Sequence, residues 1–561
     1  MLQFAPLLAV GLMLGPILFG LAGSLAPAFG FLPALGGEEV TIGHFARLWQ
    51  TPGLSGSIWL SLSSGLITTF LSLSLVVMLI SAWSGTRFFS FIQLLISPLL
   101  SIPHAATAFG LAFLLAPSGW IVRFLSPELT GWTRPPDWLF PKDPEGLALI
   151  AGLATKELPF LLLVTLAALP QVDAVRNARV AQTLGYGPMA SWLFAVWPRL
   201  YKQIRLPVFA VIAYATSVVD VALILGPTNP PTLAVQLVRW MSDPDLQYRF
   251  LASAGAILQL FVTLAALAVW WLCEKLTATL FKALVGGGWR FQRDAAWRLA
   301  SGTLVLIVIL SLILGLAGLL VWSFAGFWRF PESLPQAFTL KSWIKQLPML
   351  AEPLLNSIGI GLLAAIIALV ITLLCLEQET RAGQKAGEGA LTLLYIPLII
   401  PQVAFLFGLQ LLFLLLGWEH SALGLLLSHL VFVLPYVFLS LGDPWRHFEP
   451  RYAQLAASLG AQPWKIFFRI RLPLLLRPIM TAAAVGFAVS IGQYLATVLI
   501  GGGRWETITT EAVALSSGGN RRIIGIYAIM QMILPFVGFA LAIALPAWIH
   551  RNRRDMSPHH H

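Results

Sequence analysis

The chain has 561 residues, of which 58% are hydrophobic and only 11% charged, and its formal net charge is +11. A soluble domain of this size would carry about a quarter charged residues, so the composition excludes an ordinary water-soluble protein. The apolar runs are continuous and close to the roughly 20 residues that a helix needs to cross a bilayer. A barrel would show alternating strands instead. We therefore predict an all-α polytopic membrane protein, because lipid tolerates only helices or closed barrels.

Twelve apolar segments are long enough to cross the membrane as helices. The first segment has no basic residues ahead of its apolar run, which indicates a retained helix rather than a cleaved signal peptide. We interpret the last three residues, all histidine, as a purification tag. The expected spans are 4–29, 56–83, 88–116, 147–170, 207–227, 250–273, 299–324, 354–376, 389–417, 421–441, 474–500 and 522–548.

The distribution of Lys and Arg predicts the orientation of these spans. If the loops 171–206 and 442–473 face the cytoplasm, that side carries most of the 35 Lys and Arg residues and a minority of the 24 Asp and Glu residues. The positive-inside rule then explains the net positive charge without a nucleic-acid partner. Both termini are expected to be cytoplasmic, and the partner implied by composition is the lipid bilayer.

The two halves of the chain repeat each other. Pro103 and Gly110 align with Pro401 and Gly408 at one constant offset. Each half has six expected helices, so both share one orientation and are related by a pseudo-two-fold axis along the membrane normal. The expected units are a first repeat at 1–275, a cytoplasmic linker at 276–298, a second repeat at 299–550 and a C-terminal tail at 551–561.

A short polar pattern occurs once in each half, in the loops 171–206 and 442–473. Glycine permits a tight turn between two short helices, and the proline that follows can open the next membrane helix. Aromatic residues between them supply an apolar face that fits a groove on a partner. An interfacial amphipathic helix with snorkelling cations is the alternative. The residues concerned are Arg179, Ala181, Gly185, Pro198, Gln454, Ala456, Gly460, Ile470, Leu472 and Pro473.

These two loops resemble the coupling motif of permeases from binding-protein-dependent, type I ABC importers. The family pattern is Glu-Ala-Ala, three residues, Gly, nine residues, and Ile-x-Leu-Pro. The second copy matches at Ala456, Gly460, Ile470, Leu472 and Pro473, and the first at Ala181, Gly185 and Pro198. Arg179 and Gln454 stand where the family has Glu. If that Glu pairs with a basic residue of the ATPase, this chain uses a different contact there or its partner differs too. The duplicated layout resembles the thiamine, ferric-iron and sulfate permeases.

The resemblance implies a permease subunit in the bacterial inner membrane that is not itself an enzyme. Two copies of a separate ATPase subunit would bind ATP and Mg²⁺ and grip the two loops. A periplasmic binding protein would deliver a small polar solute to the opposite face. The sequence has no G-x-x-x-x-G-K-[ST] phosphate loop and no Cys/His cluster with metal spacing. We expect no catalytic residue, cofactor or metal in this chain.

Polar side chains within the spans are the candidates for the substrate pathway, because charge inside a membrane is costly. Pro103 and Pro401 loosen their helices beside two of these side chains, which frees carbonyls to line a cavity. Hydrogen bonding between packed helices, or a structural ion pair, is the alternative reading. The charges cluster in the first half, so we hypothesise a polar, zwitterionic or charged solute contacted mainly there. The candidates are His104, Lys156, Glu157, Asp220, Gln402 and Gln493.

Two other classes of protein fit parts of the pattern. An ion-coupled secondary transporter also has two parallel halves of six helices, and Glu157 or Asp220 would then be its ion site. A membrane scaffold without a pathway is the second alternative, and the mid-membrane charges argue against it. A carrier would work alone under an ion gradient, whereas a permease needs an ATPase subunit and ATP.

Overall fold

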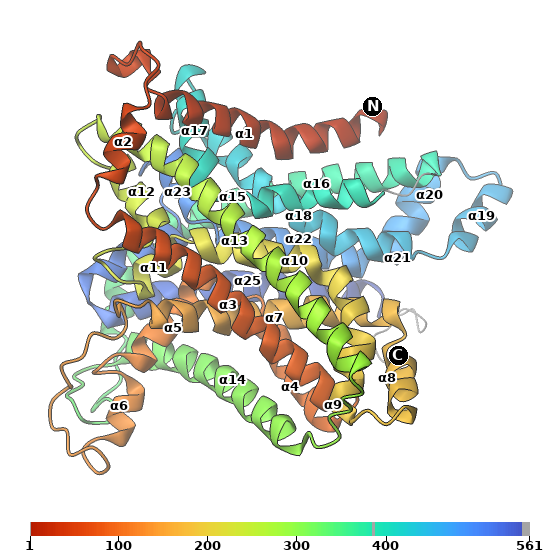
Figure 1. The fold of residues 1–561 in the computed structure, drawn as a ribbon. Coiled ribbons are helices and arrows are strands. Elements are labelled where there is room, and N and C mark those ends of the chain that lie inside the picture. Colours follow the sequence, from red (N-terminus) through yellow and green to blue (C-terminus); the bar gives the residue numbers. More distant parts are fainter. Residues whose placement is uncertain (1, 384–386, 552–561) are drawn as a thin grey trace.

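The computed structural model describes residues 2–383 and 387–551, and every named element within these ranges is a helix (Figure 1). The prediction of an all-α polytopic membrane protein is confirmed. The histidine tag falls outside the described residues.

In the first half, long helices cross the molecule and short helices turn the chain at each end. The break between α4 and α5 divides the expected span 88–116 at residues 100–103, because proline cannot continue a helix. The expected span 207–227 becomes the end of α10 followed by α11. The helices are α1 (Ala5–Ala28), α2 (Gly43–Trp49), α3 (Leu54–Trp83), α4 (Arg87–Leu99), α5 (His104–Leu115), α6 (Trp120–Leu125), α7 (Leu147–Ala168), α8 (Ala174–Thr183), α9 (Pro188–Ser191), α10 (Trp197–Ser217), α11 (Asp220–Leu225), α12 (Leu233–Met241) and α13 (Tyr248–Gly286).

The second half repeats this order of long and short helices. Its break between α16 and α17 bends the chain by 87° at Pro401, the counterpart of Pro103. The helices are α14 (Ala295–Phe324), α15 (Lys341–Ala382), α16 (Glu388–Ile399), α17 (Gln402–Leu415), α18 (Ala422–Arg446), α19 (Pro450–Ser458), α20 (Pro463–Ile466), α21 (Leu472–Leu474), α22 (Leu476–Ile491), α23 (Leu495–Gly501), α24 (Ile508–Ala514) and α25 (Arg521–Ile549).

Nine helices in the described part of the chain are long and apolar enough to cross a membrane, or up to eleven if each of two bent pairs is one span. Twelve were expected. The difference is α10, whose first turns carry Arg199, Lys202 and Arg205 and therefore dilute its apolar character. Within the expected linker 276–298, α13 continues to Gly286 and α14 begins at Ala295. We call the non-helical part, residues 287–294, the linker segment.

The two halves exchange their first helices. α1 packs against α17 of the second half, and α14 packs against α5 of the first half. Both crossings depend on glycine. A Cβ built on Gly110 would lie 2.9 Å from the carbonyl carbon of Gly315, and one built on Gly408 would overlap the carbonyl oxygen of Gly20. The repeated glycines predicted from the sequence are therefore the points where the halves lock together.

The loops with the repeated motif lie at one end of the molecule. Figure 1 shows α8 and α9 of the first loop, and α19 and α20 of the second, at the right-hand end. The long connection around α6 and the segment around α2 lie at the opposite end. The long helices run between these ends, as expected for spans that share one bilayer.

Candidate functional site

The six residues proposed for the substrate pathway meet around one cavity between the two halves. The cavity has a volume of about 300 Å³. Elements α5, α7, α10 and α11 of the first half line it on one side, and α16, α17, α18, α22 and α23 of the second half line it on the other. Its charged and amide side chains are His104, Lys156, Glu157, Asp220, Gln402 and Gln493. As expected, the charges come from the first half.

Glu157 on α7 faces His104, the first residue of α5. The Nε2 atom of His104 lies 3.2 Å from Oε1 of Glu157. The histidine ring also packs against Tyr214, with ring centroids 4.8 Å apart. The helix break before His104 places this ring at the start of α5 and so brings it to the cavity wall. Glu157 is therefore buried with a partner.

Lys156 forms hydrogen bonds with the backbone at the same helix break. Its Nζ donates hydrogen bonds to the carbonyl oxygens of Leu99, at 3.1 Å, and Leu100, at 2.8 Å. These carbonyls end α4 and have no partner within the helix, because the chain stops being helical before Pro103. A cation is also favourable at a helix C-terminus. The geometry thus gives Lys156 a structural role alongside its place in the wall.

Asp220 has no such partner. It is the first residue of α11 and only 8% exposed, and it faces the cavity. In the described ranges no basic side chain lies within ion-pair distance of it. Gln493, in the break between α22 and α23, is similarly buried and lines the opposite wall. Gln402 opens α17 there.

Three tyrosines, together with Ser101 and Ser217, complete the polar lining. Tyr214 comes from the first half, and Tyr436 and Tyr494 come from the second. Tyr436 was missed because it lies in an otherwise apolar span. The signal was present, since Pro435 directly precedes it within α18, and prolines mark the other cavity elements.

His429 and Ser490 do not line this cavity. The Nδ1 atom of His429 lies 2.8 Å from Oγ of Ser490, and its Nε2 lies 3.1 Å from Oγ1 of Thr497. These contacts join α18 to α22 and α23. The alternative expected for such residues, hydrogen bonding between packed helices, describes this group.

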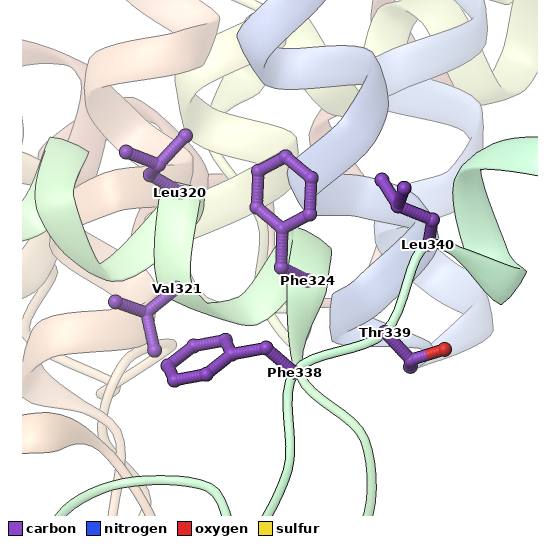
Figure 2. Close-up of a pocket in the computed structure, with 6 residues that line it drawn as sticks. All are labelled: Leu320, Val321, Phe324, Phe338, Thr339 and Leu340. Atoms are coloured by element: carbon purple, nitrogen blue, oxygen red, sulfur yellow. The ribbon is translucent and has the colours of Figure 1, made fainter.

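A second pocket, of about 490 Å³, is apolar and lies apart from the charged cavity (Figure 2). It occurs where the end of α14 meets the chain that leads into α15. Its lining offers a single hydroxyl and no charged group, so it lacks the chemistry expected of a path for a polar solute. It is lined by Leu320, Val321, Phe324, Phe338, Thr339 and Leu340.

The motif glycines form the same turn in both loops. Gly185 has φ +88° and Gly460 has φ +81°, in the left-handed region that favours glycine. In each loop the amide after the glycine donates to the carbonyl of the motif alanine, at 3.3 Å for Ala181 and 3.0 Å for Ala456. This caps α8 and α19 in the same way.

The prolines that follow differ in effect. Pro198 stands in the first turn of α10 and opens a long helix directly. Pro473 opens only the three-residue α21, and the chain then bends by 76° into α22. Of the other motif residues, Ile470 lies in the π-helical turn before α21, and Leu472 begins α21.

Exposed apolar side chains on α8 and α19 were missed by the sequence analysis. Val180 and Leu184 of the first loop correspond to Leu455 and Leu459 of the second, at the same offset that relates the motif glycines. All four are more than half exposed. Residues four apart share one face of a helix, so each loop presents a two-residue apolar ridge that ends at the motif glycine. The equal spacing of these apolar residues in the two loops could have predicted the ridges from the sequence.

Arg179 and Gln454, which replace the family Glu, lie beside these ridges and are exposed. Neither departure from the motif is buried within the chain. Both side chains are therefore open to contact with a partner.

The linker segment holds the first loop. The amide of Gly187 donates to the carbonyl of Arg290 at 3.1 Å, and the amide of Met189 donates to Oδ2 of Asp294 at 2.8 Å. Phe194, one of the aromatics expected to face a partner, instead stacks on Phe291 of the linker segment. The first loop is therefore partly covered by its own chain.

The second loop is more exposed, and charged contacts join it to α15. Arg471 forms a buried ion pair with Glu377 on α15, and Arg381 lies 2.7 Å from the same carboxylate. The Arg381 guanidinium also lies over the ring of Trp464, 4.3 Å from its centroid. No residue of α19 or α20 is buried. The two loops share a turn but differ in their surroundings.

Two pseudo-symmetric helical halves around a charged cavity define a membrane transport protein. The family model described as "binding-protein-dependent transport system inner membrane component" matches residues 379–554. The inner membrane ABC transporter permease protein YnjC of Escherichia coli K12 is 31% identical over 518 residues, which cover 92% of this chain and 93% of that protein. The chain therefore belongs to the permeases of binding-protein-dependent ABC importers.

Shorter relatives match about one half of the chain. A putative 2-aminoethylphosphonate transport system permease protein, PhnV, of Salmonella typhimurium is 28% identical over 40% of this chain and 85% of its own length. The spermidine/putrescine transport system permease protein PotC homolog of Mycoplasma genitalium is 26% identical over 37% of this chain and 73% of its own length. This chain is accordingly a fused, two-repeat permease. Family membership also decides against an ion-coupled carrier.

Proposed function

We propose that this permease forms the translocation pathway of an importer driven by two copies of a separate ATPase subunit. Each ATPase docks on one of the loops 171–206 and 442–473, at the end of the molecule that faces the cytoplasm together with both termini. ATP and Mg²⁺ bind in the ATPase and not in this chain. A periplasmic binding protein delivers the solute at the opposite face of the bacterial inner membrane.

The matched apolar ridges are the observation that carries the docking proposal. Val180 with Leu184, and Leu455 with Leu459, project from equivalent helices at one end of the molecule. A two-residue apolar ridge on a short helix suits insertion into a groove on a partner. Loss of this exposed area to a partner is favourable at about 25 cal/mol per Å² of apolar surface.

The fold suggests how docking drives transport. Each loop leads into a helix that lines the cavity, α10 in the first half and α22 in the second. Movement of the loops toward each other on ATP binding therefore acts on the cavity walls directly. The helix breaks at residues 100–103 and 400–401 lie in the same walls, where the chain has the fewest regular hydrogen bonds.

The solute proposed for this pathway is small and polar. The cavity, at about 300 Å³, is at the lower end of the usual range for small-molecule sites. The names of two relatives give 2-aminoethylphosphonate and spermidine or putrescine as solutes of those systems. The duplicated layout supports a place beside the thiamine, ferric-iron and sulfate permeases.

Charge placed on the ridges tests the docking proposal. Leu184→Glu and Leu459→Glu should each weaken retention of the ATPase subunit during purification, and the double variant should abolish it. Leu129→Glu is the matched control, because Leu129 is an equally exposed leucine near the opposite end. ATP-dependent solute uptake in liposomes should fall in parallel.

Two results would overturn the proposal. One is full retention of the ATPase by the double ridge variant. The other is solute uptake by the purified permease alone under a proton or sodium gradient, which is the behaviour of a carrier.

A further inference from the structure

The basic side chains in the cavity wall already have hydrogen-bond partners. Lys156 donates to two backbone carbonyls at the end of α4, and His104 lies against Glu157. An incoming anion would therefore find these groups engaged. It would also meet the carboxylates of Glu157 and Asp220 from the same side.

Asp220 is the acidic group of the cavity wall without a close ion-pair partner: His104 acts on it electrostatically but lies against Glu157. Asp220 is more than nine-tenths buried, faces the cavity and has no ion-pair partner within the described residues. An unpaired carboxylate buried in a protein costs several kcal/mol unless a partner arrives. The negative charge at this position thus favours a cation as the missing partner.

Three tyrosines line the same cavity as the two carboxylates. Tyr214 lies within electrostatic range of both Asp220 and Glu157, and Tyr494 lies within range of Asp220. From the second half, Tyr436 lies within range of Glu157. Tyrosine faces attract organic cations, most effectively where water is excluded. The combination of rings and carboxylates suits an ammonium group better than a neutral polar solute.

We propose that the cavity between the halves binds a small organic cation, with the ammonium group of the solute paired to Asp220 and enclosed by Tyr214, Tyr436 and Tyr494. The proposal rests on the transport function proposed above and names its substrate class. The amides of Gln402 and Gln493, on the second-half wall, accept hydrogen bonds from the rest of the solute. Sulfate is thereby removed from the range of solutes.

Thermal unfolding of the full chain in lipid nanodiscs tests the proposal, because a bound ligand raises the midpoint. Tetramethylammonium chloride and putrescine dihydrochloride should raise it in a saturable way. Sodium sulfate at equal ionic strength should not. Asp220→Asn should weaken the apparent affinity for both cations about tenfold or more, because a charged partner is lost. Glu352→Gln, which removes an exposed carboxylate from α15, is the matched control and should leave affinity unchanged.

A second pair of variants separates recognition from folding. Tyr214→Phe keeps the ring and should retain cation binding. Tyr214→Leu removes it and should weaken binding about 3- to 30-fold, the range expected from loss of a cation–π contact. Saturable stabilisation by sulfate, or equal cation affinity in Asp220→Asn and the wild type, would overturn the proposal. A response to divalent metal ions alone would do so as well.

This experiment uses no ATPase, so a negative result would reject the proposed substrate class without testing the proposed function. Cation binding with no ATPase docking would retain the substrate class and reject the importer cycle. ATPase docking that depends on the ridges, with a cavity that binds only anions, would reject the substrate class alone.

Discussion

The carboxylate of Asp294 accepts a hydrogen bond from the backbone amide of Met189 at 2.8 Å, and so ties the linker between the two halves to the first coupling loop. In the described part of the chain, no carboxylate accepts from a backbone amide of the second loop in this way, and its charged contacts run to α15 instead. The linker between the halves therefore makes the surroundings of the two loops unequal.

Asp294→Asn should loosen the first loop without unfolding the protein. A hydrogen bond to a charged group contributes about 1.5–3 kcal/mol, so hydrogen exchange at the Met189 amide should accelerate by about ten- to a hundredfold. Exchange in residues 458–466 of the second loop is the internal reference and should not change. Asp173→Asn, which alters an exposed acid at the start of α8, is the control. Equal protection of Met189 in Asp294→Asn and the wild type would contradict the role of the linker.

Gly408→Ala should weaken the joint between the halves. A Cβ at this position would overlap the backbone of Gly20 on α1, and neither helix can move away without losing its packing. Overpacking of this kind costs about 1–3 kcal/mol, so the midpoint of thermal unfolding should fall. Gly359→Ala is the control, because a Cβ there meets no atom within 4 Å and alanine favours a helix. Equal midpoints for the two variants would show that the crossing is not close-packed.

The glycine joints illustrate what the sequence could and could not predict. Alignment of Gly110 with Gly408 revealed the repeat, because equivalent positions keep equivalent residues. The partners of these glycines, Gly315 and Gly20, could not be predicted. The exchange of first helices between the halves is set by tertiary packing, which the sequence pattern does not reveal. The prediction of twelve uninterrupted spans was also inaccurate. Prolines and basic residues divide or shorten some spans, and the positions of these breaks are known only from the packed structure.

For the candidate site, too, the sequence predicted the residues but not their contacts. Membrane-embedded charge and proline predicted the six charged and amide side chains of the cavity wall, because each is costly in a membrane unless it serves a purpose. The hydrogen-bond partners of these residues could not be predicted from the sequence. The carbonyls that accept from Lys156 exist only because α4 ends where it does, and the isolation of Asp220 depends on what α11 packs against.

Gly460→Ala should uncouple the second loop from the ATPase. With φ at +81°, an alanine costs about 1–2 kcal/mol in the turn and shifts the apolar ridge. Solute-stimulated ATPase activity of the assembled importer should fall, while retention of solute by the permease alone should not. Gly460→Asn should recover part of the activity, because asparagine tolerates the left-handed region. Activity that falls equally in both variants would point to lost side-chain space rather than backbone conformation.

Lys156→Met and Asp220→Asn should change stability in opposite directions. The first leaves the carbonyl of Leu100 unsatisfied and that of Leu99 with only a 3.4 Å hydrogen bond from the amide of Ile102, at a cost of about 1–3 kcal/mol, and should lower the thermal midpoint. The second replaces a buried, unpaired charge with a neutral side chain of the same shape and should raise the midpoint. Residues kept for binding often reduce stability in this way.

Lys345→Met, on the exposed face of α15, is the control for loss of a lysine and should leave the midpoint unchanged. The opposite signs are the decisive feature. If Asp220→Asn lowered the midpoint as Lys156→Met does, Asp220 would be holding the fold together through a partner, and the cavity would have no unpaired charge to offer an ammonium group. A raised midpoint combined with lost cation binding is the outcome that only a ligand-binding carboxylate produces.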